Sequence, residues 1–78
     1  MKVKVTQNHI SKGVPGSRCL CPIALALKDM GCNYVNVSYV TEYIKDGKFT
    51  RTFVPRLALD FMIAFDANGV VEPLEFEI

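Results

Sequence analysis

Tryptophan is absent from this sequence, histidine occurs once, and no apolar run is long enough to cross a membrane. The single histidine, His9, leaves few ways to pair a nucleophile with a general base. Eight acidic residues nearly balance nine basic ones, so the chain carries no strong field to attract nucleic acid or an anionic membrane. We therefore expect neither among its partners. The first residues lack the apolar core of a signal peptide, which predicts a cytoplasmic protein.

Cysteine is also scarce, and the three thiols are Cys19, Cys21 and Cys32. Their number is odd, and Cys19 lies too close to Cys21 for an easy internal bridge, so we expect reduced thiols. Together with His9 they could supply a full set of zinc ligands. Structural zinc sites, however, use paired Cys-x2–4-Cys motifs, whereas here Cys-x-Cys is followed by a lone cysteine. We expect no metal and no cofactor.

Half of the residues are apolar, and the length suits one small domain, which we expect to span residues 1–78. Both ends alternate charged and apolar residues, in Lys2-Val3-Lys4-Val5 and in Leu74-Glu75-Phe76-Glu77-Ile78, as half-buried strands do. Paired side by side, these strands would set lysines against glutamates on the solvent face and turn their apolar residues inward. The two termini should therefore be neighbours in one sheet.

Between the ends, the sequence predicts one long hairpin over residues 34–54 and three helices. Asp46-Gly47 is typical of a two-residue type I′ turn, and counting outward from it pairs Glu42 with the oppositely charged Arg51. The helices are expected over residues 7–12, over residues 22–30 with Pro22 as the first helical residue, and over residues 55–66 with Pro55 as the first helical residue. This order predicts an α+β domain with a largely antiparallel sheet of about four strands. The N- and C-terminal strands would pair beside the long hairpin, with two main helices on one face.

Several apolar residues fall outside the expected core. In residues 55–66 the helical period gives one apolar stripe, made of Leu57, Ala58, Phe61, Met62 and Phe65. Leu59 and Ile63 lie on the other side among polar residues, and the hairpin tip adds Tyr43, Ile44 and Phe49. These five residues are the candidate interaction surface, for a second copy of the chain or for a partner protein. The alternative is that they are isolated exposed apolar side chains, which are common.

Cys21 directly precedes Pro22, which places its thiol at or beside the N-cap of an apolar helix. In one interpretation the helix dipole lowers the pKa of the thiol and makes it reactive. In the other, Cys21 is a small buried hydrophobe. A nucleophile would need His9 as its base, and no oxyanion hole can be named, so we expect no catalytic residue and no enzyme.

The loop of residues 13–18 leads into this helix start and could hold an anion with its backbone N–H groups and a nearby cation. The candidate ligand-binding residues are Gly13, Gly16, Arg18 and Cys21. The spacing does not match the Walker A motif of nucleotide-binding proteins. The alternative is that Pro15 and Gly16 only form a tight turn.

Two parts of the chain resemble a small family of phage and prophage proteins. The first has His9-Ile10 and Gly13, followed by Cys21-Pro22-Ile23-Ala24-Leu25-Ala26-Leu27. The second has Val54-Pro55, Phe61, Phe65-Asp66 and Val71-Glu72-Pro73-Leu74-Glu75-Phe76. Cys19 stands outside this pattern. The resemblance implies a phage accessory protein made in the bacterial cytoplasm, and it carries over no catalytic residue.

Residues and resemblance together predict a non-enzymatic phage accessory protein that binds a host or defence component through its apolar surface. The alternative is a protein that binds or sequesters a nucleotide or another anion with residues 13–18 and the helix start at Cys21. A third interpretation, a thiol or metal protein, would require a reactive Cys21.

Overall fold

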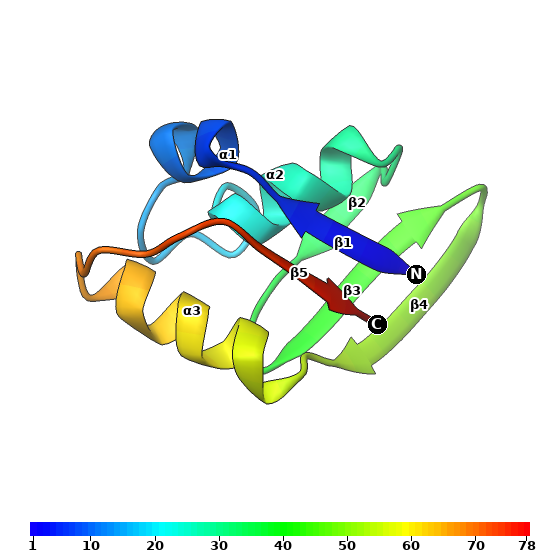
Figure 1. Cartoon of the computed structure of the whole chain (residues 1–78). Helices are drawn as coiled ribbons and strands as arrows, with labels where there is room; N and C mark the ends of the chain where they lie inside the picture. Colours follow the sequence, from blue (N-terminus) through cyan, green and yellow to red (C-terminus); the bar gives the residue numbers. More distant parts are fainter.

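The chain folds into three helices and five strands, which a computed structural model describes over residues 1–78 (Figure 1). In chain order they are β1 (Lys2–Val5), α1 (Gln7–Lys12), α2 (Pro22–Asp29), β2 (Tyr34–Asn36), β3 (Val40–Lys45), β4 (Lys48–Phe53), α3 (Arg56–Asp66) and β5 (Leu74–Glu77). All strand pairs are antiparallel, so the predicted α+β class is confirmed. The longest helix, α3, has 11 residues, and none has the length and apolar character that a bilayer crossing requires.

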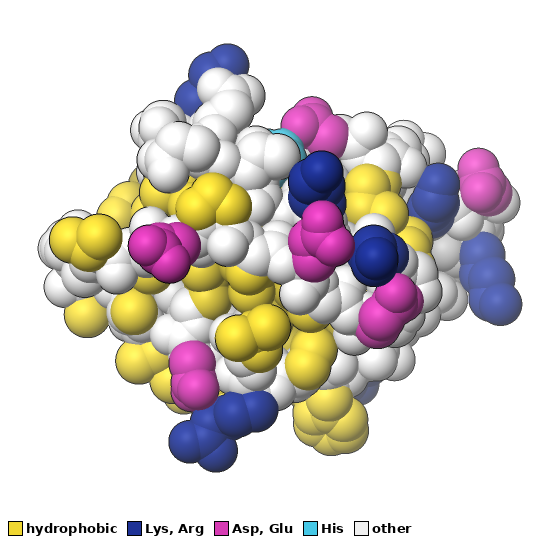
Figure 2. All heavy atoms as spheres, in the orientation of Figure 1, with side chains coloured by type: hydrophobic (Ala, Val, Ile, Leu, Met, Phe, Trp, Pro, Cys, Tyr) yellow, Lys and Arg dark blue, Asp and Glu magenta, His cyan; other side chains and the backbone are white.

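The two termini lie side by side because β1 pairs with β5, as the alternating sequences predict (Figure 1). Lys4 stands opposite Glu75, with its Nζ 3.9 Å from Glu75 Oε1, and Figure 2 shows basic and acidic side chains alternating on this face of the molecule. Val3 and Phe76 pair on the other face and are buried. Opposite charges outside and apolar residues inside therefore fix this register.

The hairpin of β3 and β4 has the predicted turn and register. Asp46 and Gly47 have φ values of 53° and 76°, which are the positive values that a type I′ turn requires at both positions. Glu42 pairs with Arg51, and Arg51 Nε lies 3.6 Å from Glu42 Oε2.

The segment before this hairpin differs from the prediction, because residues 34–45 do not form one continuous strand. The chain reverses at residues 37–39, and β2 folds back onto β3 as a third strand. Two hydrogen bonds hold the reversal: Val37 N–H donates to Arg18 O at 2.7 Å, and Ser38 Oγ donates to Val40 O at 2.9 Å. The strands therefore form two sheets, β1-β5 and β2-β3-β4, instead of one sheet.

Helix α1 is tied to α2 by the imidazole of His9. Thr6 caps α1, and its backbone N–H donates to His9 Nδ1 at 2.9 Å. Since Nδ1 accepts this bond, a neutral ring carries its proton on Nε2, which lies 2.6 Å from Asp29 Oδ2 near the end of α2. The only histidine is thus buried and bonded at both nitrogens.

Helix α2 is apolar on nearly all sides because it packs against α1, β1 and β2. Pro22 is its first residue, as predicted, and Gly31 follows the helix with a positive φ of 95°. Ile23, Ala24 and Leu27 are almost fully buried and belong to the single hydrophobic cluster of the domain. This helix forms the centre of the core.

Helix α3 packs on β5, its buried residues are Ala58, Phe61 and Phe65, and the two phenyl rings stack with centroids 6.3 Å apart. Pro55 is the N-cap and not the first helical residue, since its ψ of 159° is extended. Leu57 was expected in the buried stripe, but it is exposed because it lies in the first turn, at the margin of that stripe.

Candidate functional site

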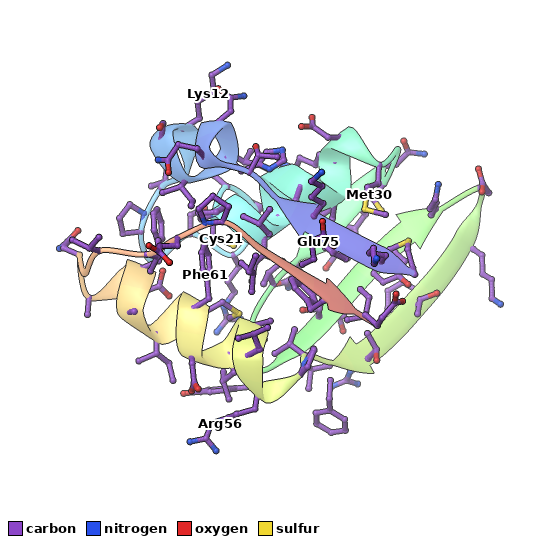
Figure 3. The ribbon with its side chains drawn as sticks, viewed as in Figure 1. Lys12, Cys21, Met30, Arg56, Phe61 and Glu75 are labelled. Carbon is purple, nitrogen blue, oxygen red and sulfur yellow. The ribbon has the colours of Figure 1, made fainter.

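A pocket opens between α3, the start of α2 and the reversal at residues 37–39, and we call it the α3 pocket. Its volume is about 180 Å³. Most of its wall is apolar, and its polar side chains come from the loop of residues 16–18, from the reversal and from the end of α3. Its lining residues are Gly16, Ser17, Arg18, Cys21, Pro22, Ile23, Val37, Ser38, Tyr39, Leu59, Phe61, Met62, Ile63, Phe65 and Asp66. Two of them, Cys21 and Phe61, are labelled in Figure 3, where they lie between α2 and α3.

Helix α3 supplies one wall of the pocket. This wall includes the side of the helix on which the sequence places apolar residues outside the main apolar stripe. Leu59 and Ile63 both line it, although Leu59 is half-buried and Ile63 is 55% exposed. Met62 and Asp66 lie on the same side of the helix. The apolar residues among polar ones on α3 are therefore explained by a cavity.

The loop of residues 16–18 supplies the polar rim. Gly16 N–H donates to Asp66 Oδ1 at 2.9 Å, and Ser17 N–H donates to Val14 O at 3.3 Å. These two N–H groups are already bonded within the protein, so they do not form the predicted anion cradle. Arg18 makes no ion pair, is exposed and lies on the rim. It is the one cation that the pocket can offer to a ligand.

Gly13 is a candidate ligand residue that lies outside the pocket. Its N–H donates to His9 O at 2.9 Å, and a β-carbon at this position would stand 2.6 Å from Pro22 Cδ. Lys12, on the neighbouring helix α1, projects away from the rest of the molecule in Figure 3. Gly13 therefore allows the close contact with Pro22 and takes no part in the pocket.

Cys21 is the N-cap of α2, as predicted, and its Sγ accepts a hydrogen bond from Ala24 N–H at 3.5 Å. Burial raises the pKa of this thiol above its ordinary value, the nearby Asp66 raises it further, and the Ala24 N–H only partly offsets the increase. The side chain is 6% exposed. Of the two interpretations, the structure supports the small buried hydrophobe, because desolvation outweighs the helix terminus.

The remaining thiols and the histidine form no common centre. Both nitrogens of His9 are bonded, to Thr6 and Asp29, so neither is left for Cys21. Cys32 is buried and Cys19 is exposed, and no three metal-ligating side chains come together anywhere in the chain.

The hairpin tip does not join the α3 pocket, and it is not a single surface. Ile44 and Phe49 pair on the outer face of the β2-β3-β4 sheet, where Phe49 is 54% exposed. Tyr43 was predicted on the interaction surface, but it is buried, because alternation along β3 turns it to the face opposite Ile44. The predicted surface residues are thus divided between the pocket, the core and the outer sheet face.

Sequence reasoning missed the wall formed by the reversal, where Ser38 and the 69% exposed Tyr39 complete the pocket. The reversal contains neither glycine nor proline, and the local signal for a turn is limited to Asn36 and Ser38.

The fold and the site together define a small α+β protein with an apolar pocket that has a single cationic residue on its rim. Searches against protein-family models, characterised proteins and solved structures find no match to this chain.

Proposed function

We propose that this chain is a non-enzymatic binding protein that takes one apolar side chain of a partner protein into the α3 pocket. The observation that carries the proposal is that Leu59, Ile63 and Arg18, which has no ion-pair partner, line the same cavity. Following the resemblance to phage proteins, the partner would be a host or defence component in a bacterial cell.

The size of the pocket suits a single apolar side chain of the partner, which we call the anchor. Its volume of about 180 Å³ is close to that of an engineered Leu/Ile/Phe-lined cavity of about 150 Å³ that binds benzene. Drug-sized ligands occupy roughly 300–1,000 Å³. One leucine, methionine or phenylalanine side chain therefore fits, and a whole nucleotide does not.

The charge on the rim supports an acidic residue beside the anchor. Asp66 already accepts a hydrogen bond from Gly16, whereas Arg18 has no carboxylate partner. An arginine side chain offers a planar set of donors that suits a carboxylate. The favoured segment is an apolar residue followed by Asp or Glu.

The affinity of a single anchor is low. Burying one large apolar side chain contributes up to about 3 kcal/mol, and an exposed ion pair with Arg18 adds up to about 1 kcal/mol; the sum of about 4 kcal/mol corresponds to a Kd of about 1 mM. A short peptide with leucine followed by two aspartates should therefore bind with a Kd on the order of 1 mM, and a folded partner would add contacts around the rim.

The experiment is a binding titration of this peptide against wild type and two variants of α3. Ile63→Asp places a charge in the pocket wall and should weaken binding at least tenfold. Leu57→Asp is the matched control, because Leu57 is 59% exposed on the same helix and does not line the pocket. Equal affinities of the two variants would overturn the proposal.

A small ligand is the second candidate, favoured by the position of Gly16, Arg18 and Cys21 in the same pocket. The chemistry of the wall suits a small apolar carboxylic acid, with its acid group on Arg18. A thermal-shift panel of short-chain carboxylic acids and nucleotides tests it: stabilisation by an acid that Arg18→Ala abolishes supports this candidate, and no shift with any compound removes it.

A further inference from the structure

The outer edge of β4 is free of any neighbour. β4 is the last strand of the β2-β3-β4 sheet, and no other strand or helix lies beside its outer edge (Figure 1). It contains neither proline nor a bulge, and all six of its residues pair regularly with β3. Such an edge is a template for another strand. It shares no residue with the α3 pocket.

The backbone groups on this edge can be assigned from the turn. In a two-residue hairpin, the residues that flank the turn form a hydrogen-bonded pair, and such pairs then alternate with non-hydrogen-bonded ones. Lys45 and Lys48 flank the turn here, so the backbone groups of Thr50 and Thr52 also point toward β3. The N–H and C=O groups of Phe49, Arg51 and Phe53 therefore point outward, and they have no strand partner.

We propose that two copies of this chain pair through β4, antiparallel and with Arg51 opposite Arg51 of the second copy. In this register all three outward-facing residues of each strand form hydrogen-bonded pairs, which gives about six new hydrogen bonds. A twofold axis at Arg51 relates the copies, and the two three-stranded sheets become one continuous sheet.

The side chains of β4 are self-complementary in this register. On the outer face, Phe49 of each copy stands opposite Phe53 of the other, which gives two aromatic pairs. In the single chain Phe49 is 54% exposed and Phe53 is 78% exposed. Thr50 meets Thr52 on the inner face, also twice. Aromatic pairs and Thr–Thr pairs are among the favourable cross-strand neighbours. A shift by two residues in either direction would replace both aromatic pairs with Phe–Arg pairs.

The one like-charge pair, Arg51 with its copy, is neutralised within each chain. Arg51 Nε lies 3.6 Å from Glu42 Oε2 on β3, so the central row across the joined sheet would read Glu, Arg, Arg, Glu. Opposite charges next to each arginine offset the repulsion between the two.

The other sheet edges are less suited to pairing. β2 has only three residues, and Val37, the residue that follows it, donates its N–H to Arg18 O. β1 and β5 carry alternating charges on their exposed face, and Pro73 directly precedes β5. β4 is the one long edge without a directly adjacent proline and without such alternating charges. Once two copies pair through it, no further edge of this kind is left, so assembly stops at a dimer.

Disulfide trapping tests the register directly, with Cys19→Ser as background to remove the exposed native thiol. In the proposed dimer the two copies of residue 51 have Cα atoms about 5.5 Å apart, within disulfide range. Arg51→Cys should therefore cross-link on mild oxidation. Lys48→Cys is the matched control: it is exposed on the same strand, but its copies would lie about 20 Å apart.

Sedimentation of the unmodified chain tests the assembly without an added thiol. At concentrations on the order of 100 μM we expect twice the chain mass of 8.7 kDa. Arg51→Pro removes an outward N–H and leaves the pairing with β3 intact, so it should raise the dissociation constant at least tenfold, as should Phe53→Lys. A wild-type monomer, or equal cross-linking of Arg51→Cys and Lys48→Cys, would overturn the proposal.

Discussion

Gly13 lies directly against the ring of Pro22, so that a β-carbon on Gly13 would stand 2.6 Å from Pro22 Cδ and 2.7 Å from Cγ. The φ of Gly13 is −68°, which any residue can adopt. Its glycine is therefore needed for space and not for conformation. The contact joins the end of α1 to the start of α2, on which the core is built.

Gly13→Ala should lower the free energy of unfolding by about 2–3 kcal/mol, because the proline ring cannot move without shifting α2. Urea unfolding followed by circular dichroism measures it. Gly16→Asn is the contrast: Gly16 has a φ of 76° with nothing near its β-position, and asparagine tolerates that conformation. Similar losses in the two variants would show that the close approach is unimportant.

His9→Ala should destabilise the protein by about 2 kcal/mol, since it removes the reciprocal cap with Thr6 and the bond to Asp29. His9→Gln separates the two contacts. Glutamine at this helix position can still accept from the Thr6 N–H, so it should recover roughly half of the loss. If His9→Gln were as unstable as His9→Ala, the cap would not be the source of the effect.

Alkylation of the native protein near neutral pH should modify Cys19 alone. Cys19 is exposed, whereas burial keeps Cys21 and Cys32 protonated and shielded from reagent. Mass spectrometry after a short iodoacetamide pulse should find one added group, which Cys19→Ser abolishes, and three groups after unfolding. Fast modification of Cys21 in the folded protein would restore the reactive-thiol interpretation.

Stability should fall as the pH rises above about 9. Burial raises the pKa of Cys21 above the ordinary value of 9.0, so the unfolded chain loses this proton first. The free energy of unfolding then decreases by up to about 1.4 kcal/mol per pH unit for each such thiol. Urea titrations between neutral and alkaline pH should show a shallower decline for Cys21→Ala than for wild type; identical slopes would contradict this account.

Thr41→Val should stabilise the protein by about 1 kcal/mol. Thr41 is fully buried on the inner face of β3, and its hydroxyl has no hydrogen-bond partner. Valine keeps the shape and removes the cost of burying an unsatisfied polar group. Thr50→Val on β4, where the side chain is partly exposed, is the control and should change little. A loss of stability in Thr41→Val would show that the hydroxyl is bonded in solution.

The elements that could be predicted are those whose cause is local. Asp46-Gly47 determines both the turn and the register of β3 with β4, and Pro22 marks the start of α2. The pairing of β1 with β5 joins residues that are far apart in the sequence. It could still be predicted, because the opposite charges of the two strands are complementary residue by residue.

The elements that could not be predicted depend on distant contacts. The reversal at residues 37–39 needs Arg18 O as the partner of Val37 N–H, and no sequence pattern links these positions. The α3 pocket has the same origin: periodicity showed Leu59 and Ile63 to be unusual, but only the reversal places Tyr39 across from them.

The most direct test of the binding function is a methyl-detected NMR titration with the leucine–aspartate peptide, taken to about 10 mM, well above the expected Kd of roughly 1 mM. We expect saturating shifts of the Leu59, Met62 and Ile63 methyl signals, while those of Leu57 stay fixed. Unchanged spectra, or shifts shared equally by Leu57, would contradict it.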